Sequence, residues 1–308
     1  MVIGLLSALL GGLQACFTND LKRVLAYSTV SQLGYMVYAV GVGAVFASQF
    51  HLLNHSIFKA LLFLAAGSVI HALGTRDMRA MGAVRKTLPF VFWVFLIGAL
   101  ALVGIPLTNG FFSKEMILEH GLEAGPGWAY VGMLIATAMT SVYVIRMLWM
   151  VFFGDPAGER AHADKQSAMK VSLGVLGLGV VTSWMIAGRF SQTLLASLPF
   201  HEWLSESTIE ILIELLRAPS TWITLLVIVA GAGAWLSLRQ RPKSTEQSPA
   251  TRFVQGGLGF EAVNRSIVRA ANGLSAAVRI TQTGQLQWNL LGLVGALILF
   301  LCLMAIGA

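Results

Sequence analysis

The chain has 308 residues, of which 56% are hydrophobic and only 11% are charged, and its formal net charge is +7. A soluble domain of this size carries about 25% charged residues, and its interior is too small to hide so much apolar surface. The composition therefore excludes a soluble globular protein and indicates a membrane protein. The positive charge predicts basic loops beside an anionic membrane surface, so nucleic acid is not needed to explain it.

The two cysteines, Cys16 and Cys302, are not candidates for metal or redox chemistry. Both lie in apolar runs, and neither has a partner at the spacing of a metal site or a redox motif. We interpret them as small buried hydrophobic residues. The first apolar run lacks a basic leader and a small-residue cleavage site, so we expect a membrane span there rather than a signal peptide.

Several apolar segments along the chain are long enough to cross a bilayer. A span needs about 20 residues, and in the hydrocarbon core a helix satisfies its own backbone hydrogen bonds. The sequence predicts an all-α integral membrane fold with about eight transmembrane helices, at residues 1–17, 25–45, 48–73, 88–118, 127–153, 170–189, 220–238 and 288–307.

The predicted spans divide the chain into four regions. Residues 1–153 hold the first five spans and residues 154–238 hold two more. Residues 239–287 contain prolines and glycines, then apolar residues at helical spacing among arginines. This pattern predicts an amphipathic segment on the inner membrane surface or against partner helices. Residues 288–308 are expected to form a terminal transmembrane anchor.

Lysine and arginine are unevenly distributed between alternate loops. If the amino terminus lies outside, the inner loops hold seventeen of the 21 basic residues, and the outer loops hold Arg189 and Arg217. The remaining two, Lys59 and Lys114, lie within predicted spans. Because basic residues favour the inner side of a membrane, we predict an outside amino terminus.

The third predicted span carries three titratable side chains spaced four residues apart. His51, His55 and Lys59 share one helix face at this spacing. A lysine near mid-membrane costs about 3 kcal/mol even on the mildest scale, so it persists where it faces protein or water. A single intramembrane histidine is as often a hydrogen-bonded structural residue as a relay. Three stacked groups favour a proton or ion path, and histidine titrates near neutral pH.

The fourth predicted span, residues 88–118, is interrupted near its middle. Pro106 lacks a backbone donor and breaks a helix, and glycines lie on both sides of it. In transporters, broken helices lie where irregular backbone lines a wet cavity. Lys114 and Glu115 follow the break and are predicted to belong to the same proton path. The alternative is that Lys114 extends to the outer interface.

Three motifs resemble the antiporter-like subunits of respiratory complex I. They are DLKRVLAYSTVSQLGYM at residues 20–36, HLLNHSIFKALLF at residues 51–63 and GIPLTNGFFSKEMIL at residues 104–118. A fourth motif, TGQLQWN at residues 283–289, is similar to the lead-in to the last span of subunit 5, also called subunit L. The chain therefore resembles the carboxy-terminal half of such a subunit, with residues 1–153 as the second of two inverted five-helix repeats.

The resemblance implies proton translocation driven by quinone chemistry in distant subunits of an NADH-quinone oxidoreductase. It implies that Lys59 is the central relay lysine, that His51 and His55 extend the relay, and that Lys114, with Glu115, passes protons toward the outside. No cofactor is expected in this chain. Flavin, iron–sulfur clusters and quinone are expected in other subunits, in an energy-transducing membrane such as the bacterial inner membrane.

The chain departs from the family pattern in two ways. The first repeat is absent, so we hypothesise a separate polypeptide that supplies it, with a truncated sequence as the alternative. The segment that corresponds to the family's long lateral helix is also short in this chain. About 50 residues separate the last two predicted spans, and a helix of that length reaches at most about 75 Å. A shortened lateral helix is therefore expected.

Other functions remain compatible with these motifs. A multi-chain sodium–proton antiporter shares them, although the TGQLQWN segment and the amphipathic segment argue against it. A related membrane-bound hydrogenase or inorganic-carbon uptake complex could use the same half. A purely structural anchor is a third class, but buried charges without a use would be costly.

Overall fold

The computed structural model describes residues 1–155, 167–197, 207–239, 254, 259–280 and 286–306. These residues form helices and one isolated bridge between Asp20 and Asp77, and no strand occurs among them. The chain separates into two compact units, residues 1–247 and residues 248–308. The predicted all-α fold is confirmed.

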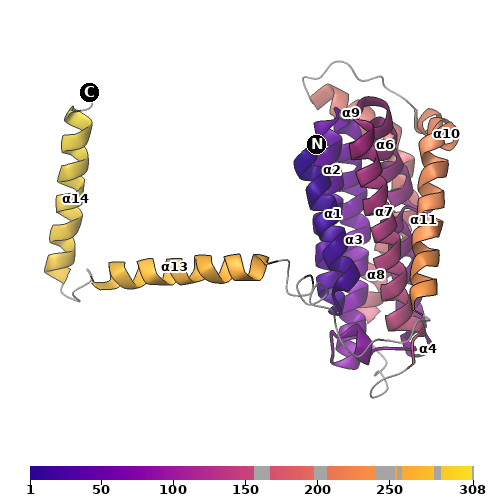
Figure 1. Ribbon diagram of the computed structural model, residues 1–308, viewed down its shortest axis with the longest axis horizontal. Helices are drawn as coiled ribbons and strands as arrows, with labels where there is room; N and C mark the ends of the chain where they lie inside the picture. Colours follow the sequence, from indigo (N-terminus) through magenta and orange to yellow (C-terminus); the bar gives the residue numbers. More distant parts are fainter. Residues whose placement is uncertain (156–166, 198–206, 240–253, 255–258, 281–285, 307–308) are drawn as a thin grey trace. The chain divides into compact units, whose positions relative to one another are not determined.

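The first unit is a bundle of helices (Figure 1). It begins with α1 (Val2–Phe17), α2 (Leu21–Gly41) and α3 (Val45–Leu73), and continues with a short 3-10 turn and α4 (Val84–Thr87). It then has α5 (Pro89–Val103), α6 (Asn109–Ala124) and α7 (Gly127–Leu148), which ends in a π-helical turn, Trp149–Phe153. The last helices are α8 (Ser167–Thr182), a 3-10 turn at Ser183–Ile186, α9 (Ala187–Ser197), α10 (Thr208–Arg217) and α11 (Pro219–Leu238).

Four helical segments of the described residues are long and apolar enough to cross a membrane: Val45–Leu73, Gly127–Phe153, Ala168–Leu194 and Pro219–Ser237. Shorter apolar helices cover Val2–Phe17, Pro89–Val103 and Leu290–Ala305. Together they make this a multi-pass membrane protein. The total of eight spans stays a prediction, since α2 falls in neither group by length and composition.

The helices α1 and α2 pack in close contact along the bundle. A methyl group on Gly4 would lie 2.3 Å from the backbone nitrogen of Tyr38, and one on Gly34 would lie 2.4 Å from that of Ala8. Glycine is therefore required at these two positions, because the two backbones touch. Membrane helices commonly pack through small residues in this way.

Buried apolar side chains form two clusters, and α3 contributes to both. One cluster takes Phe46 and Phe50 from the first turns of α3, and the other takes Phe58 and Leu61 from beyond its middle. The intervening buried residues of α3 are polar. A polar layer therefore separates the two apolar halves of the bundle.

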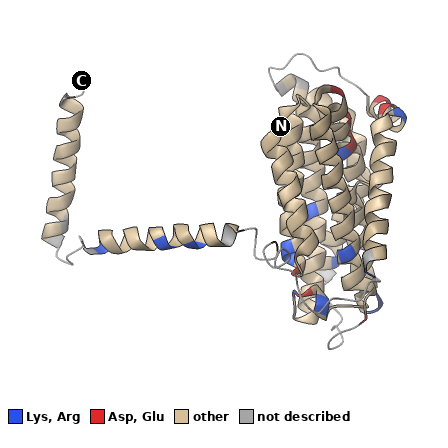
Figure 2. Ribbon diagram, viewed as in Figure 1, with Lys and Arg blue, Asp and Glu red and all other residues tan. Residues whose placement is uncertain are grey.

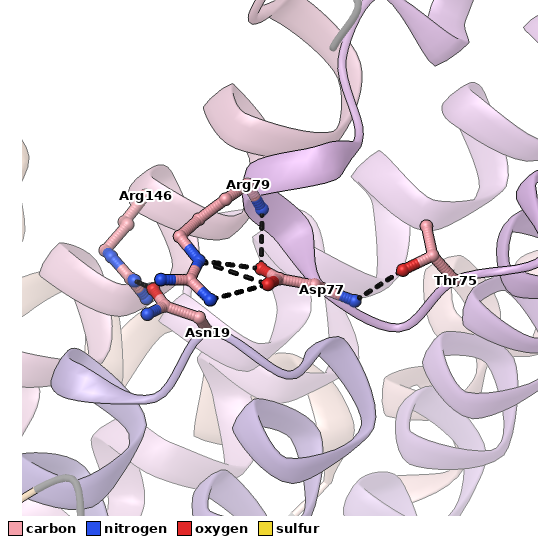
Figure 3. A network of polar contacts seen from close by, with 5 residues as sticks. All are labelled: Asn19, Thr75, Asp77, Arg79 and Arg146. Carbon is pink, nitrogen blue, oxygen red and sulfur yellow. Dashed lines mark hydrogen bonds and ion pairs between the residues drawn. The ribbon is translucent and has the colours of Figure 1, made fainter. Parts of the chain in front are cut away.

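The loops at the α4 end of the bundle are tied together by an arginine network (Figure 3). Arg146, from the last turn of α7, donates hydrogen bonds to the backbone oxygen of Thr18 at 2.7 Å and to the side-chain oxygen of Asn19. Nearby, Arg79 forms an ion pair with Asp77 at 2.6 Å. These contacts connect the end of α7 to the turn between α1 and α2.

The ion pair between Asp77 and Arg79 adds little to stability. The hydrogen bond from Arg79 holds the pKa of the Asp77 carboxyl below its usual range. Its stabilisation is therefore present at neutral pH and is lost as the pH falls through the folded-state pKa. Both side chains are substantially exposed, at 61% and 38%, so water screening limits the contribution to well under about 1 kcal/mol.

Basic residues gather mainly at the α4 end of the bundle, as Figure 2 shows. This agrees with the loop pattern used to predict orientation. The side of the membrane on which the amino terminus lies stays a prediction.

The second unit contains α13 (Phe260–Ile280) and α14 (Leu286–Ile306). The 21 residues of α13 fit the expected shortened amphipathic helix, and Val263, Ile267 and Leu274 are exposed on it. Parts of the predicted segment 239–287 and of the TGQLQWN motif, at residues 240–253, 255–258 and 281–285, lie outside the described residues.

Candidate functional site

The three titratable residues predicted on α3 are buried and adjacent. His51, His55 and Lys59 are 1%, 5% and 6% exposed, and each lies one helical turn from the next. The two imidazole rings are 6.0 Å apart between centroids. The helical spacing thus becomes a line of buried titratable side chains inside the bundle.

His51 connects α3 to two other helices. Its Nδ1 lies 2.9 Å from the Ser113 hydroxyl on α6, and its Nε2 lies 3.1 Å from the Gln32 amide oxygen on α2. A neutral imidazole donates from one nitrogen and accepts at the other. With the amide placed this way, Nε2 donates to Gln32, and Nδ1 accepts from Ser113 only when that hydroxyl does not donate to the Asn109 carbonyl. Protonation of His51 would require Ser113 to turn its own proton away, toward the Asn109 carbonyl 3.0 Å from it.

Lys59 is held by uncharged acceptors of α2. Its ammonium donates to the Leu25 carbonyl at 3.2 Å and to the Ser28 hydroxyl. His55, one turn away, packs edge-on against Phe58 with ring centroids 5.2 Å apart. The buried His55 Nε2 has no hydrogen-bond partner among the described residues. A buried polar atom in this position is suited to an exchangeable proton or a water.

The predicted helix break is confirmed between α5 and α6. The first helix ends at Val103, where Gly104 adopts a left-handed conformation with φ of 93°. Leu107 also has a positive φ, 71°, which is unusual for a residue with a side chain. Pro106, which has no amide proton, lies within the break, and the helix resumes at Asn109.

The break positions Lys114 inside the protein. The Lys114 side chain is 0% exposed, and its ammonium donates to the Val103 carbonyl at 3.2 Å. That carbonyl belongs to the last turn of α5, where backbone oxygens lack helical partners and the helix dipole favours a cation. The Tyr35 ring lies 4.9 Å from the same ammonium. Lys114 therefore does not extend to the outer interface.

Glu115, the last of the five predicted residues, is also 0% exposed. Neither of its carboxylate oxygens has a hydrogen-bond partner among the described residues. The adjacent Lys114 supplies the opposite charge. The structure thus places an acidic and a basic side chain next to each other in the chain and inside the bundle.

A second polar cluster holds the start of α6 against α3. The Asn109 amide donates to the Ser183 hydroxyl at 3.0 Å, and Ser183 donates to the Asn54 side chain at 2.8 Å. Ser183 opens the 3-10 turn between α8 and α9, so this apolar segment is also interrupted beside the broken helix.

Sequence reasoning missed the contributions of Ser113 and Ser183. Single serines in membrane helices are commonly packing residues, so their type alone did not distinguish them. His71, which is on α3 with His51, His55 and Lys59, is exposed near the end of that helix and does not join them. Only the packing of α3 against α6 and the 3-10 turn identifies the two serines.

The comparisons with known proteins agree with this fold. Residues 1–140 match the family described as NADH:quinone oxidoreductase/Mrp antiporter, TM. Subunit L of the F(420)H(2) dehydrogenase of Methanosarcina mazei is 43% identical over 188 residues, covering 56% of this chain and 28% of that protein. NADH-quinone oxidoreductase subunit L of Escherichia coli is 37% identical over 255 residues, covering 82% of this chain and 40% of that protein.

A solved structure gives the same fold along almost the whole chain. The Mrp complex from Dietzia sp. DQ12-45-1b has a TM-score of 0.68 at 22% identity, covering 99% of this chain and 33% of that one. The chain spans well under half the length of the curated relatives named above.

The helical bundle, its broken helix and its buried lysines define an antiporter-like membrane domain. More particularly, residues 1–140 match the NADH:quinone oxidoreductase/Mrp antiporter family, and the chain is similar to relatives named subunit L or chain 5.

Proposed function

We propose that this chain translocates protons across the membrane as part of a complex I-type NADH-quinone oxidoreductase. Lys59 is the central site, His55 and His51 are its neighbours along α3, and Lys114 with Glu115 forms the site after the helix break. The chain itself performs no electron transfer. Flavin, iron–sulfur clusters and quinone are assigned to other subunits of the complex.

One observation carries the proposal: a buried line of titratable groups leads from α3 to the broken helix. Lys59, His55 and His51 follow one another by single helical turns. His51 then contacts Ser113, the residue directly before Lys114. Burial of two lysines and a glutamate in an apolar bundle is expensive, which supports a role in ion transport over a role in anchoring.

The mechanism follows from electrostatics in a low-dielectric interior. Two like charges disfavour each other strongly there, so protonation of one site promotes deprotonation of the next. The Ser113 hydroxyl, shared between His51 and the Asn109 carbonyl, can turn as the imidazole changes its protonation state. A charge change at Lys59 would then be passed stepwise toward Lys114.

The direct test replaces each lysine by alanine in the assembled complex. Lys59→Ala and Lys114→Ala should each lower proton translocation in proteoliposomes by at least about tenfold, while the complex still assembles. Lys170→Ala, at an exposed position of α8, is the matched control. Proton transport that is equal to that of the unmodified complex in both lysine variants would rule out this function.

A second candidate function is sodium–proton exchange in a multi-chain antiporter. The fold shared with an Mrp complex is the observation in its favour. Vesicles containing the purified complex distinguish the two functions. Proton movement that requires sodium, and that occurs without quinone reduction, would favour the antiporter.

We propose that a separate chain completes the channel by supplying a first antiporter-like repeat, beside the other membrane subunits. The chain covers only 28% and 40% of the two curated relatives named above, which supports a further chain. We also propose the bacterial inner membrane as the location, with the amino terminus outside. Mass spectrometry of the intact complex tests the first point, since one polypeptide that contains both repeats would contradict a separate chain.

A further inference from the structure

The 3-10 turn Ser183–Ile186 contacts the first turn of α6, directly after the helix break. The Ser183 hydroxyl accepts a hydrogen bond from the Asn109 amide at 3.0 Å. The next residue, Trp184, stacks on the Phe112 ring, with 4.5 Å between the centroids and 20° between the planes. Asn109 and Phe112 are three residues apart, so they lie on one face of α6. Two adjacent residues of the turn therefore hold one face of α6.

The turn itself is fixed by two other helices. The Ser183 hydroxyl donates to the Asn54 side-chain oxygen on α3 at 2.8 Å. On α10, the Thr208 hydroxyl donates to the Met185 carbonyl at 3.1 Å and accepts from the Gly188 amide at 3.0 Å. Ser183 thus uses its hydroxyl as a donor to α3 and as an acceptor from α6. The turn is anchored in this way and forms a fixed support for the second half of the broken helix.

Hydrogen bonds continue from this support to a buried imidazole of α3. The Asn109 carbonyl accepts from the Ser113 hydroxyl at 3.0 Å, one turn further along α6. That hydroxyl lies 2.9 Å from Nδ1 of His51. A hydrogen bond weakens steeply when its distance or angle departs from the favoured range. A shift of the first turn of α6 would therefore change how Ser113 meets His51.

We propose that Ser183 is a positioning residue for proton transfer at His51, because it fixes the first turn of α6 and thereby places the Ser113 hydroxyl against the imidazole. This inference rests on the proposed function. In the described part of the chain, the Ser183 side chain bonds to asparagines of α3 and α6 and to no titratable group, so its effect on His51 passes through α6. Ser183 lies outside residues 1–140, which match the antiporter family, so a segment beyond that region contributes to the site.

The first test removes the Ser183 hydroxyl in the assembled complex and measures proton translocation in proteoliposomes. Ser183→Ala should lower the rate per assembled complex about fivefold, the factor that one buried hydrogen bond typically carries. Ser183→Thr keeps a hydroxyl and should restore most of the rate. Ser172→Ala is the matched control, because it removes an exposed hydroxyl of α8 that bonds to its own helix, and it should leave transport unchanged.

A double variant separates positioning from an independent effect. Ser113→Ala removes the hydroxyl beside His51 and should itself lower transport. Because Ser183 acts through Ser113, adding Ser183→Ala to Ser113→Ala should lower the rate no further. A double variant whose loss equals the product of the two single losses would show that the two serines act separately, and it would overturn the positioning role.

The remaining outcomes distinguish this inference from the proposed function. A Ser183→Ala complex that assembles poorly but transports normally per complex would show a role in stability alone and would overturn the inference. Normal transport in Ser183→Ala, with transport lost in Lys59→Ala, would overturn the positioning role and leave the proposed function standing. Normal transport in Lys59→Ala as well would overturn both.

Discussion

At the scale of single residues, the two buried lysines of the bundle have different hydrogen-bond acceptors. Lys114 lies against the carboxyl end of α5. The Val103 carbonyl oxygen accepts a hydrogen bond from its ammonium, and the helix dipole favours its positive charge. Lys59 has the Leu25 carbonyl and the Ser28 hydroxyl as its acceptors. The two buried lysines therefore differ in their surroundings: Lys59 has two local acceptors, and Lys114 has one acceptor at the end of a helix.

Replacement of Lys59 by arginine separates charge from titration. A guanidinium keeps its proton in proteins, so the variant retains the positive charge but cannot release a proton. Lys59→Arg should assemble and yet translocate protons at least about tenfold more slowly than the unmodified complex. Lys170→Arg, at an exposed site on α8, is the matched control. Transport at the normal rate in Lys59→Arg would mean that a fixed charge is sufficient.

At the scale of elements, the broken helix depends on close contact between its two halves. Gly110, in the first turn of α6, packs against the backbone of Ala101 on α5. This contact lets α6 start beside α5, and Lys114 then reaches back across the break to Val103. The position of the lysine is thus a consequence of how two helices pack.

Gly110→Ala should disturb this contact. The added methyl group would lie 1.9 Å from the Ala101 oxygen, so α6 has to move. Overpacking of this kind typically costs about 1–3 kcal/mol, and we expect a lower Tm of the purified complex together with impaired proton transport. Gly67→Ala on α3 is the control, since a methyl group there meets no atom within 4 Å. A Gly110→Ala variant with unchanged Tm would show that α6 tolerates the displacement.

At the scale of the whole molecule, α13 and α14 form a unit of their own with extensive apolar exposure. Val263, Ile267 and Leu274 on α13 are all more than half exposed. Their spacing places them along one side of the helix, while Asn272 lies on another. An apolar stripe on a basic helix favours contact with a membrane surface or with partner helices.

A charge placed on this stripe should weaken the association with neighbouring subunits. Ile267→Asp replaces an exposed apolar side chain of the stripe by a carboxylate, and we expect fewer partner chains to co-purify with this one. Asn272→Asp introduces the same charge away from the stripe and should have little effect. The measurement is the yield of each co-purified chain by quantitative mass spectrometry. Equal yields for the two variants would argue against a partner-binding stripe.

The sequence by itself determined the membrane class, the helical fold and the break around Pro106 in the predicted span 88–118, because these depend on local composition and on residues such as proline. It also predicted that His51, His55 and Lys59 share a face, since helical spacing alone places them together. The division of the chain into spans was less certain, because polar residues along α2 lower its hydropathy while neighbouring helices bury them.

Only the tertiary structure decided which groups the buried histidines and lysines contact. The Ser113 hydroxyl beside His51, the Val103 carbonyl beside Lys114 and the Ser183 hydroxyl beside Asn109 come from segments distant in sequence. Ser and Thr occur in many membrane helices as packing residues, so their type carries little information alone. Their role depends on which helix faces meet, and that is decided by packing across the bundle.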